Sequence, residues 1–259
     1  MKKRNVLALA ALAFAPAMAM AQVPWFENFD SYATGVNING QGGWQGWGNV
    51  PNQAPVTTNA QFLSANNSIL VSGSGDTGTP ATYSDNVRKF TGVGAGSGWY
   101  EYTANIYVPG NTTGNAYFIL LNGYADPSGP FNWSVEYKID GTAGTFSDDY
   151  TNGTSTVSGA GNSRNGTTKA LIRDAWVPIR VDFDLTNNVM QAWYNNLPIS
   201  GGSWKTTATS TLNLAATDLY SGTSTGVYFD NLSLTQIPAP GSLAILGLGG
   251  LIAGRRRRS

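Results

Sequence analysis

Two stretches of the chain alternate apolar and polar residues without a break. In FNWSVEYKID (131–140) every second residue is apolar, among them Trp133 and Val135, and WVPIRVDFDL (176–185) repeats the pattern. Successive side chains of a β-strand point to opposite faces, so both stretches predict strands with one buried and one solvent-exposed face. Such half-buried strands are typical of antiparallel sheets, and Trp133 is expected on the buried face with Val135.

Further apolar runs bounded by turn residues predict strands at 68–72, 99–108, 116–124, 214–220 and 227–234. The strand at 189–194 is expected to follow a turn and to lead into another at Asn195 and Asn196, because asparagine tolerates the positive φ of hairpin turns. The spacing gives roughly ten to twelve strands. Two packed sheets bury both sets of apolar faces, which predicts an all-β sandwich.

Two segments interrupt this rhythm. The glycine- and serine-rich segment 72–80 is expected to be a loop, whereas 148–169 is too long for a hairpin turn and is either a surface excursion or a weak edge strand. The segment 116–121 differs again, because it is apolar on both faces of its expected strand.

The composition removes several kinds of chemistry. The chain has no cysteine and no histidine, which excludes disulfides, thiolate nucleophiles, imidazole bases and the usual zinc ligands. Only 12% of its residues are charged, while 32 are glycines and 12% are aromatic, a mixture that suits short strands joined by turns.

The N-terminus reads as a secretory signal peptide over residues 1–21. Lys2, Lys3 and Arg4 precede an apolar run, and a small-residue site stands before Gln22. An amphipathic or buried helix would need polar residues at helical spacing, and 6–21 has none. The mature chain is expected to begin near Gln22 and to be exported.

The C-terminus has three parts in order. Pro238 and Pro240 keep the chain extended, 242–254 carries no charge, and four arginines follow. The uncharged part spans roughly 20 Å as a helix, short of the roughly 30 Å hydrocarbon core, and the arginines would stay on the cytoplasmic side. An ordinary tail anchor is the alternative interpretation.

This order resembles the PEP-CTERM sorting signal of exported proteins in Gram-negative bacteria. The resemblance covers 237–259 and implies a membrane-bound exosortase as processing partner, with the membrane contacted through a short transmembrane sorting helix. The family's central Glu is Ala here. The residues that match, or stand in place of, the signal are Pro238, Ala239, Pro240, Arg255, Arg256, Arg257 and Arg258.

The net charge of the folded part excludes one class of partner. Seven of the fifteen basic residues lie in the two terminal signals, so eight remain against fifteen acidic residues, a net charge of −7. An acidic domain repels phosphate backbones, and no basic patch is interleaved with aromatics, so nucleic acid is not expected to bind.

A second resemblance concerns the body of the chain, 22–236. FENFDSYATGVNINGQGGWQGWG (26–48), the hairpin at 176–196 and GVYFDNLSL (226–234) are similar to parts of bacterial concanavalin A-like, or laminin G-like, jelly rolls. The resemblance implies a jelly-roll β-sandwich. It also implies a structural Ca²⁺ site that ties the chain ends together, with Asp30 and Asp230 in the matching places; calcium takes six to eight oxygen ligands, which carboxylates, carbonyls and water can supply.

Glycan-active enzymes of this fold use paired carboxylates, and the chain has only three glutamates. Glu101 and Glu136 both fall on the more polar face of their strands, so a facing pair is conceivable. Solvated strand carboxylates are the commoner case, and perturbed acids are the exception.

Eight tryptophans invite a sugar-binding interpretation, because aromatic faces stack on pyranose rings. The candidates near glycine-rich turns are Trp44, Trp47, Trp99 and Trp204. Most aromatic residues of a sandwich belong to its core, so core packing is the alternative for each. The sequence favours a non-catalytic protein of the cell envelope or extracellular matrix; the alternatives are a carbohydrate-binding module for an extracellular polysaccharide and a glycan-active hydrolase or lyase.

Overall fold

A computed structural model describes residues 23–50, 55–73, 83–94, 96–153 and 155–238. They form the predicted all-β sandwich, in which every pair of neighbouring strands is antiparallel. The signal peptide at 1–21 and all of the sorting signal beyond Pro238 lie outside the described residues. Within the described ranges, no helix has the length and apolar character needed to cross a membrane.

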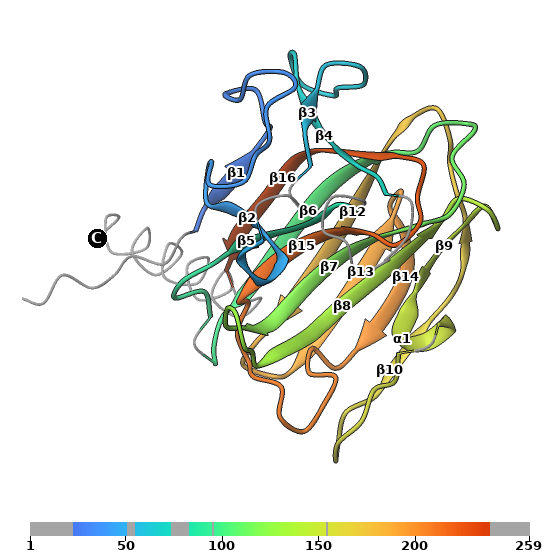
Figure 1. The fold of residues 1–259 in the computed structure, drawn as a ribbon. Coiled ribbons are helices and arrows are strands. Elements are labelled where there is room, and N and C mark those ends of the chain that lie inside the picture. Colours follow the sequence, from blue (N-terminus) through green and yellow to red (C-terminus); the bar gives the residue numbers. More distant parts are fainter. Residues whose placement is uncertain (1–22, 51–54, 74–82, 95, 154, 239–259) are drawn as a thin grey trace, which may run out of the picture.

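Figure 1 shows the two sheets packed face to face. The described residues give one sheet nine strands, in the order β10 (Arg164–Gly166), β14 (Leu197–Gly202), β13 (Val189–Tyr194), β12 (Trp176–Asp184), β6 (Trp99–Tyr107), β16 (Val227–Ile237), β4 (Ser68–Val71) and β3 (Thr57–Thr58), with β1 (Trp25–Glu27) also paired to β16. They give the other sheet seven: β11 (Lys169–Ala170), β9 (Thr145–Asp148), β8 (Phe131–Asp140), β7 (Asn115–Tyr124), β15 (Ala216–Ser221), β5 (Asp85–Lys89) and β2 (Trp44–Gly46). The described helices are two short ones, the 3-10 turn η1 (Trp47–Asn49) and α1 (Asp149–Asn152).

The core lies between the sheets. Along β6 and β12 every second residue is buried, as the alternation predicts for a sheet with one face on the core and one in water. The hydroxyls of Tyr137 on β8 and Ser200 on β14 lie 2.7 Å apart and bond across the core. The two sheets are therefore joined by a hydrogen bond as well as by apolar packing.

The longer strands begin and end close to the predicted positions. The turn at Asn195 and Asn196 is confirmed, with φ of 49° and 61° between the paired residues Tyr194 and Leu197. The described residues hold sixteen strands, more than the roughly ten to twelve expected. The short ones, β1, β2, β3, β10 and β11, have two or three residues each and lie at sheet margins, where a period of two cannot be read.

The segment 148–169 resolves into edge pieces. It contains α1 and then β10, which pairs with β14 at the margin of the nine-stranded sheet. The next strand, β11, pairs with β9 at the margin of the seven-stranded sheet. Each interpretation holds for part of the segment: β10 is a weak edge strand, whereas 155–163 contain no strand and are mostly exposed.

The expectation for Trp133 is wrong. Leu120 pairs with Val135 and Leu121 pairs with Trp133, so Ser134 has no partner across the ladder and forms a β-bulge. Asn122 is the corresponding extra residue of β7, and its side-chain amide donates to the Ser134 hydroxyl at 2.5 Å. One inserted residue reverses the facing of the strand, so Val135 enters the core while Trp133 lies on the outer face of the sheet.

Candidate functional site on the outer face of the seven-stranded sheet

The outer face of the seven-stranded sheet, which points away from the core, is apolar at its centre. Val87 on β5, Ile119 and Leu121 on β7, and Ala216 on β15 are buried there in a second cluster. Half-buried aromatic side chains cover them, namely Trp47, Tyr117, Tyr124, Trp133 and Tyr220. The outer face of an antiparallel sheet is ordinarily polar, so this face has the character of a binding surface.

Trp47 reaches this face by the alternation of β2. Trp44 points into the core, and Trp47, three positions later, lies on the opposite face and stacks on Trp133, with ring centroids 5.9 Å apart and an interplanar angle of 13°. A sharp turn follows, in which Gly48 and Asn49 both have a φ of 63°, a left-handed conformation that suits these two residue types. The Phe131 ring lies 4.7 Å from Trp47, so three rings form one wall.

Beside this wall lies a hollow of about 410 Å³. Its lining combines aromatic, apolar and acidic side chains: Trp47, Asp85, Ile119, Phe131, Trp133, Glu136, Asp218 and Tyr220. Asp218 on β15 is paired with Ile119 of β7, and Ile119 is paired with Glu136 of β8. Two strand spacings of about 4.8 Å put the Cα atoms of Asp218 and Glu136 roughly 10 Å apart.

The carboxyl of Asp218 is strongly perturbed. Burial raises the pKa of its carboxyl well above the ordinary value, and the charge of Asp85 and a hydrogen bond between the two side chains raise it further. Among the described residues its Oδ1 atom is buried without a hydrogen-bond partner. Two adjacent buried carboxyls cannot both ionise cheaply, so this pair holds a proton above the usual range.

Glu136 is shifted in the same direction. Burial raises the pKa of its carboxyl, the Ser155 hydroxyl, which donates to Oε2 at 2.8 Å, lowers it, and the charge of Asp149 raises it. The hollow thus holds a buried proton donor and a second carboxyl on the far side of Ile119. Nowhere in the described ranges does a group of three or more His, Cys, Asp or Glu residues form a set that could hold a metal ion.

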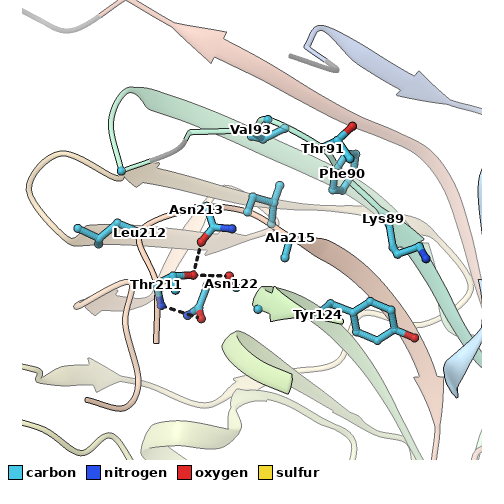
Figure 2. A pocket seen from close by; sticks show the side chains of 14 residues that line it. Lys89, Phe90, Thr91, Val93, Asn122, Tyr124, Thr211, Leu212, Asn213 and Ala215 are labelled. Carbon is cyan, nitrogen blue, oxygen red and sulfur yellow. Dashed lines mark hydrogen bonds between the residues drawn. The ribbon is translucent and has the colours of Figure 1, made fainter. Parts of the chain in front are cut away.

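A larger hollow of about 750 Å³ adjoins this site at Tyr124. Figure 2 shows Asn122, Thr211 and Asn213 turned toward one another inside it. Thr211 donates its hydroxyl to the carbonyl oxygen of Asn122 at 2.6 Å, and Lys89 on its rim pairs with Asp126 at 3.1 Å. Three polar residues of this hollow, Asn122, Thr211 and Asn213, are thus bonded to one another, and its lining has no acidic residue.

The four tryptophans proposed for sugar stacking separate into three places. Trp44 is 1% exposed and donates its indole N–H to Glu27, while Trp204 is fully buried with its ring stacked on Phe183 at 4.3 Å. Neither core ring can meet a ligand. Trp47 belongs to the wall described above, and Trp99 lies half-buried on the outer face of the nine-stranded sheet.

The two glutamates considered as a pair are not brought together. Glu101 lies on the outer face of the nine-stranded sheet near Arg180, at 3.8 Å, whereas Glu136 lies on the outer face of the other sheet. The core separates them. Sequence reasoning missed Asp85, Asp218 and Tyr220. The available signal for the last two was that 116–121, the neighbour of their strand in the sheet, is apolar on both faces.

Asp30 and Asp230 lie close enough for the charge of Asp30 to raise the pKa of Asp230, although burial is the larger cause. Asp230 accepts the backbone N–H groups of Leu63 and Ser64, at 2.7 and 3.0 Å, and that of Asn231. Asp30 accepts from Asn28 and Asn67. N–H donors therefore already bond to the carboxylate oxygens that calcium would need as ligands. The calcium site stays a prediction.

Comparison with known proteins gives the fold. No protein-family model matches the chain, and neither does any curated protein sequence. An endo-1,3-beta-glucanase from Streptomyces sioyaensis aligns with a TM-score of 0.54 at 11% identity, over 83% of this chain and 96% of that one. The T. cruzi calreticulin globular domain gives 0.54 at 10% identity, over 88% and 94%. A sialidase gives 0.50 at 8% identity, over 83% of this chain and 18% of its own.

These likenesses confirm a jelly-roll β-sandwich and, at about 10% identity, show the fold alone. They also correct one expectation. The sequence favoured a protein that is not an enzyme. The same fold, however, extends over nearly all of a glucanase, so this fold occurs in an enzyme. The exclusion of an enzyme therefore does not hold.

Proposed function

We propose that this protein binds a polysaccharide chain on the outer face of its seven-stranded sheet. The observation that carries the proposal is the wall of Trp47, Phe131 and Trp133 beside buried carboxyls. Aromatic rings stack on the apolar faces of sugars, while carboxyl groups hydrogen-bond their hydroxyls. The adjoining hollow at Tyr124 gives a chain of several sugars room to continue.

Hydrolysis of that chain is the second candidate function, favoured by the raised pKa of Asp218. A protonated Asp218 would give its proton to the glycosidic oxygen as the bond to the anomeric carbon breaks. Glu136, once ionised, would take a proton from the water that attacks that carbon. Inverting glycosidases hold their two carboxyls roughly 6.5–9.5 Å apart, and side chains on Cα atoms roughly 10 Å apart can reach that separation.

The place of action follows from the terminal signals and is likewise proposed. Residues 1–21 would export the chain, and the exosortase-type signal from Pro238 to Arg258 would deliver it to the envelope or extracellular matrix. Deleting 237–259 should release the protein into the medium. A deletion variant that stays with the envelope would contradict the sorting role.

Binding and hydrolysis are tested together on a panel of soluble polysaccharides. Wild type should bind at least one of them, and Trp47→Ala should lose that binding, because one side of the wall is gone. The control is Trp193→Ala on the outer face of the other sheet. Asp218→Asn should keep a neutral glycan bound but release no reducing ends; equal hydrolysis by wild type and this variant would remove Asp218 from the chemistry.

A further inference from the structure

The hollow on the outer face is lined by an excess of acidic residues. Three of its eight lining residues are acidic, Asp85, Glu136 and Asp218, and none is a lysine or arginine. A fourth carboxyl, that of Asp149 on α1, is near enough to raise the pKa of Glu136. Hydrolysis needs two carboxyls, so the hollow holds more acid than that reaction uses.

The neighbouring cations are already engaged. Lys89 at the end of β5 pairs with Asp126 at 3.1 Å, and Lys138 on β8 pairs with Asp140 at 3.1 Å. Arg164 is buried beside Asp148 at 3.7 Å, under the ring of Tyr150. None of these three basic residues lines the hollow.

Asp218 supplies an acceptor that lacks a donor. Its side chain is 2% exposed, lines the hollow, and leaves Oδ1 without a hydrogen-bond partner among the described residues. An unsatisfied buried carboxyl oxygen is costly, and it is satisfied best by a charged N–H donor. The rings of Trp47 and Trp133 also line the hollow, and an aromatic ring can hold a cation as well as a sugar ring.

We infer that the glycan held on this face carries free amino groups, so that a ligand ammonium meets Asp218 and its neighbouring carboxyls. The inference rests on the proposed function and names its substrate class: a polymer containing non-acetylated amino sugars. The ammonium donates to Asp218 Oδ1 and compensates the charge that Asp85 and Glu136 add. The carbon faces of the sugar ring lie on the aromatic wall.

The same charge pattern excludes other glycans. Polyuronates bring further carboxylates to an acidic hollow and are repelled. Neutral and N-acetylated sugars can stack and hydrogen-bond, but they leave the carboxyl charges uncompensated. Since the attraction is partly between whole charges, added salt weakens the binding of the amino glycan more than that of a neutral one.

The test uses the purified full-length chain and four hexasaccharides of matched length. These are β-1,4-linked glucosamine, N-acetylglucosamine, glucose and glucuronate, each titrated by calorimetry at one pH. The glucosamine hexamer should bind at least about tenfold more tightly than the others, which one charged hydrogen bond supplies. Asp218→Asn and Glu136→Gln should each reduce that preference, while Glu101→Gln, the matched control on the opposite face, should leave it unchanged.

The outcomes separate the two proposals. If the neutral or N-acetylated hexamer binds as tightly as glucosamine, or if Asp218→Asn keeps the preference in full, the amino-glycan inference is wrong and the binding face stands. Binding of the glucosamine hexamer to Trp47→Ala as tightly as to wild type would place the glycan away from the aromatic wall and overturn both proposals. If none of the hexamers binds and the wider polysaccharide panel is also negative, both proposals fall.

Discussion

The outer faces of the two sheets of this sandwich differ in kind. On the nine-stranded sheet, β6 and β12 present half-exposed residues at every second position, and polar pairs such as Thr103 with Ser233, 2.7 Å apart, face the water. On the seven-stranded sheet, β7 and β15 are buried on both faces over most of their length. Strand alternation alone accounts for the first face, whereas the second departs from it and is covered by half-buried aromatic side chains.

The charged residues of the two outer faces also have different partners. Arg180 on the nine-stranded sheet stacks on Trp193 at 3.9 Å and lies 3.2 Å from Asp182 and 3.8 Å from Glu101, so both acids share a basic partner. Asp218 on the seven-stranded sheet has another acid, Asp85, as its partner. A buried pair of acids costs stability, and this cost is one reason for proposing that the ligand binds to the seven-stranded face.

The largest effect is expected from removing a ring of the wall. Trp133→Ala should weaken binding of the glycan identified by the panel by at least about thirtyfold, or about 2 kcal/mol, because central aromatic anchors carry most of a binding energy. Trp193→Ala, on the other outer face, should leave the affinity unchanged. Calorimetric titration measures both, and circular dichroism checks that each variant is folded. Equal losses in the two variants would erase the distinction between the faces.

The second largest effect is expected at the β-bulge that turns Trp133 outward. Asn122→Ala removes the amide that donates to Ser134, together with the side-chain oxygen that accepts the backbone N–H of Thr211. Losing buried hydrogen bonds should lower the free energy of unfolding by about 1–3 kcal/mol. Denaturant unfolding measures the loss. Near-ultraviolet circular dichroism should change too, since the stacked pair of Trp47 and Trp133 is disturbed; an unaltered spectrum would mean that the bulge holds without Asn122.

The regular strands could be predicted from the sequence, whereas the features of the outer face of the seven-stranded sheet could not. β6, β8 and β12 were located within a residue of their ends because alternation over nine or ten residues is a strong local signal. The side of the sheet on which Trp133 lies could not be predicted. A bulge is defined by the register of two strands, and the apolar–polar alternation of FNWSVEYKID continues across the bulge without a break. Asp218 has no motif around it, and its role comes from its position between β7 and Asp85 of β5, which the sequence does not show.

The third prediction concerns pH. The pKa of Asp218 is raised by burial and by Asp85, so the native protein keeps a proton that the unfolded chain loses above the ordinary value of 3.8. Its contribution to stability is therefore present below that pH and is lost as pH rises toward the native pKa. Asp218→Asn should melt at a higher temperature than wild type at pH 7, and the difference should vanish at low pH.

The matched control for this pH effect is Glu101→Gln. Glu101 is half-exposed beside Arg180 on the polar face, where ion pairs contribute about 0–1 kcal/mol. Its melting curve should follow that of wild type closely at every pH. If Asp218→Asn also followed wild type, the acid pair would not be coupled to folding, and the main electrostatic difference between the faces would disappear.

The smallest effect is expected from calcium, where the first and last strands meet beside the nine-stranded sheet. The resemblance to concanavalin A-like jelly rolls predicts a structural ion between Asp30 and Asp230. Asp230 already accepts three backbone N–H groups, so an ion would have to replace hydrogen bonds rather than fill unsatisfied oxygens. The net gain should be about 1 kcal/mol, which raises the melting temperature by about 2–4 °C for a domain of this size. Melting wild type in EDTA and in millimolar Ca²⁺ measures the shift, and Asp230→Asn should abolish it. Identical melting of wild type in both buffers would mean that the N–H donors of the 63–64 loop, and not an ion, hold these two aspartates.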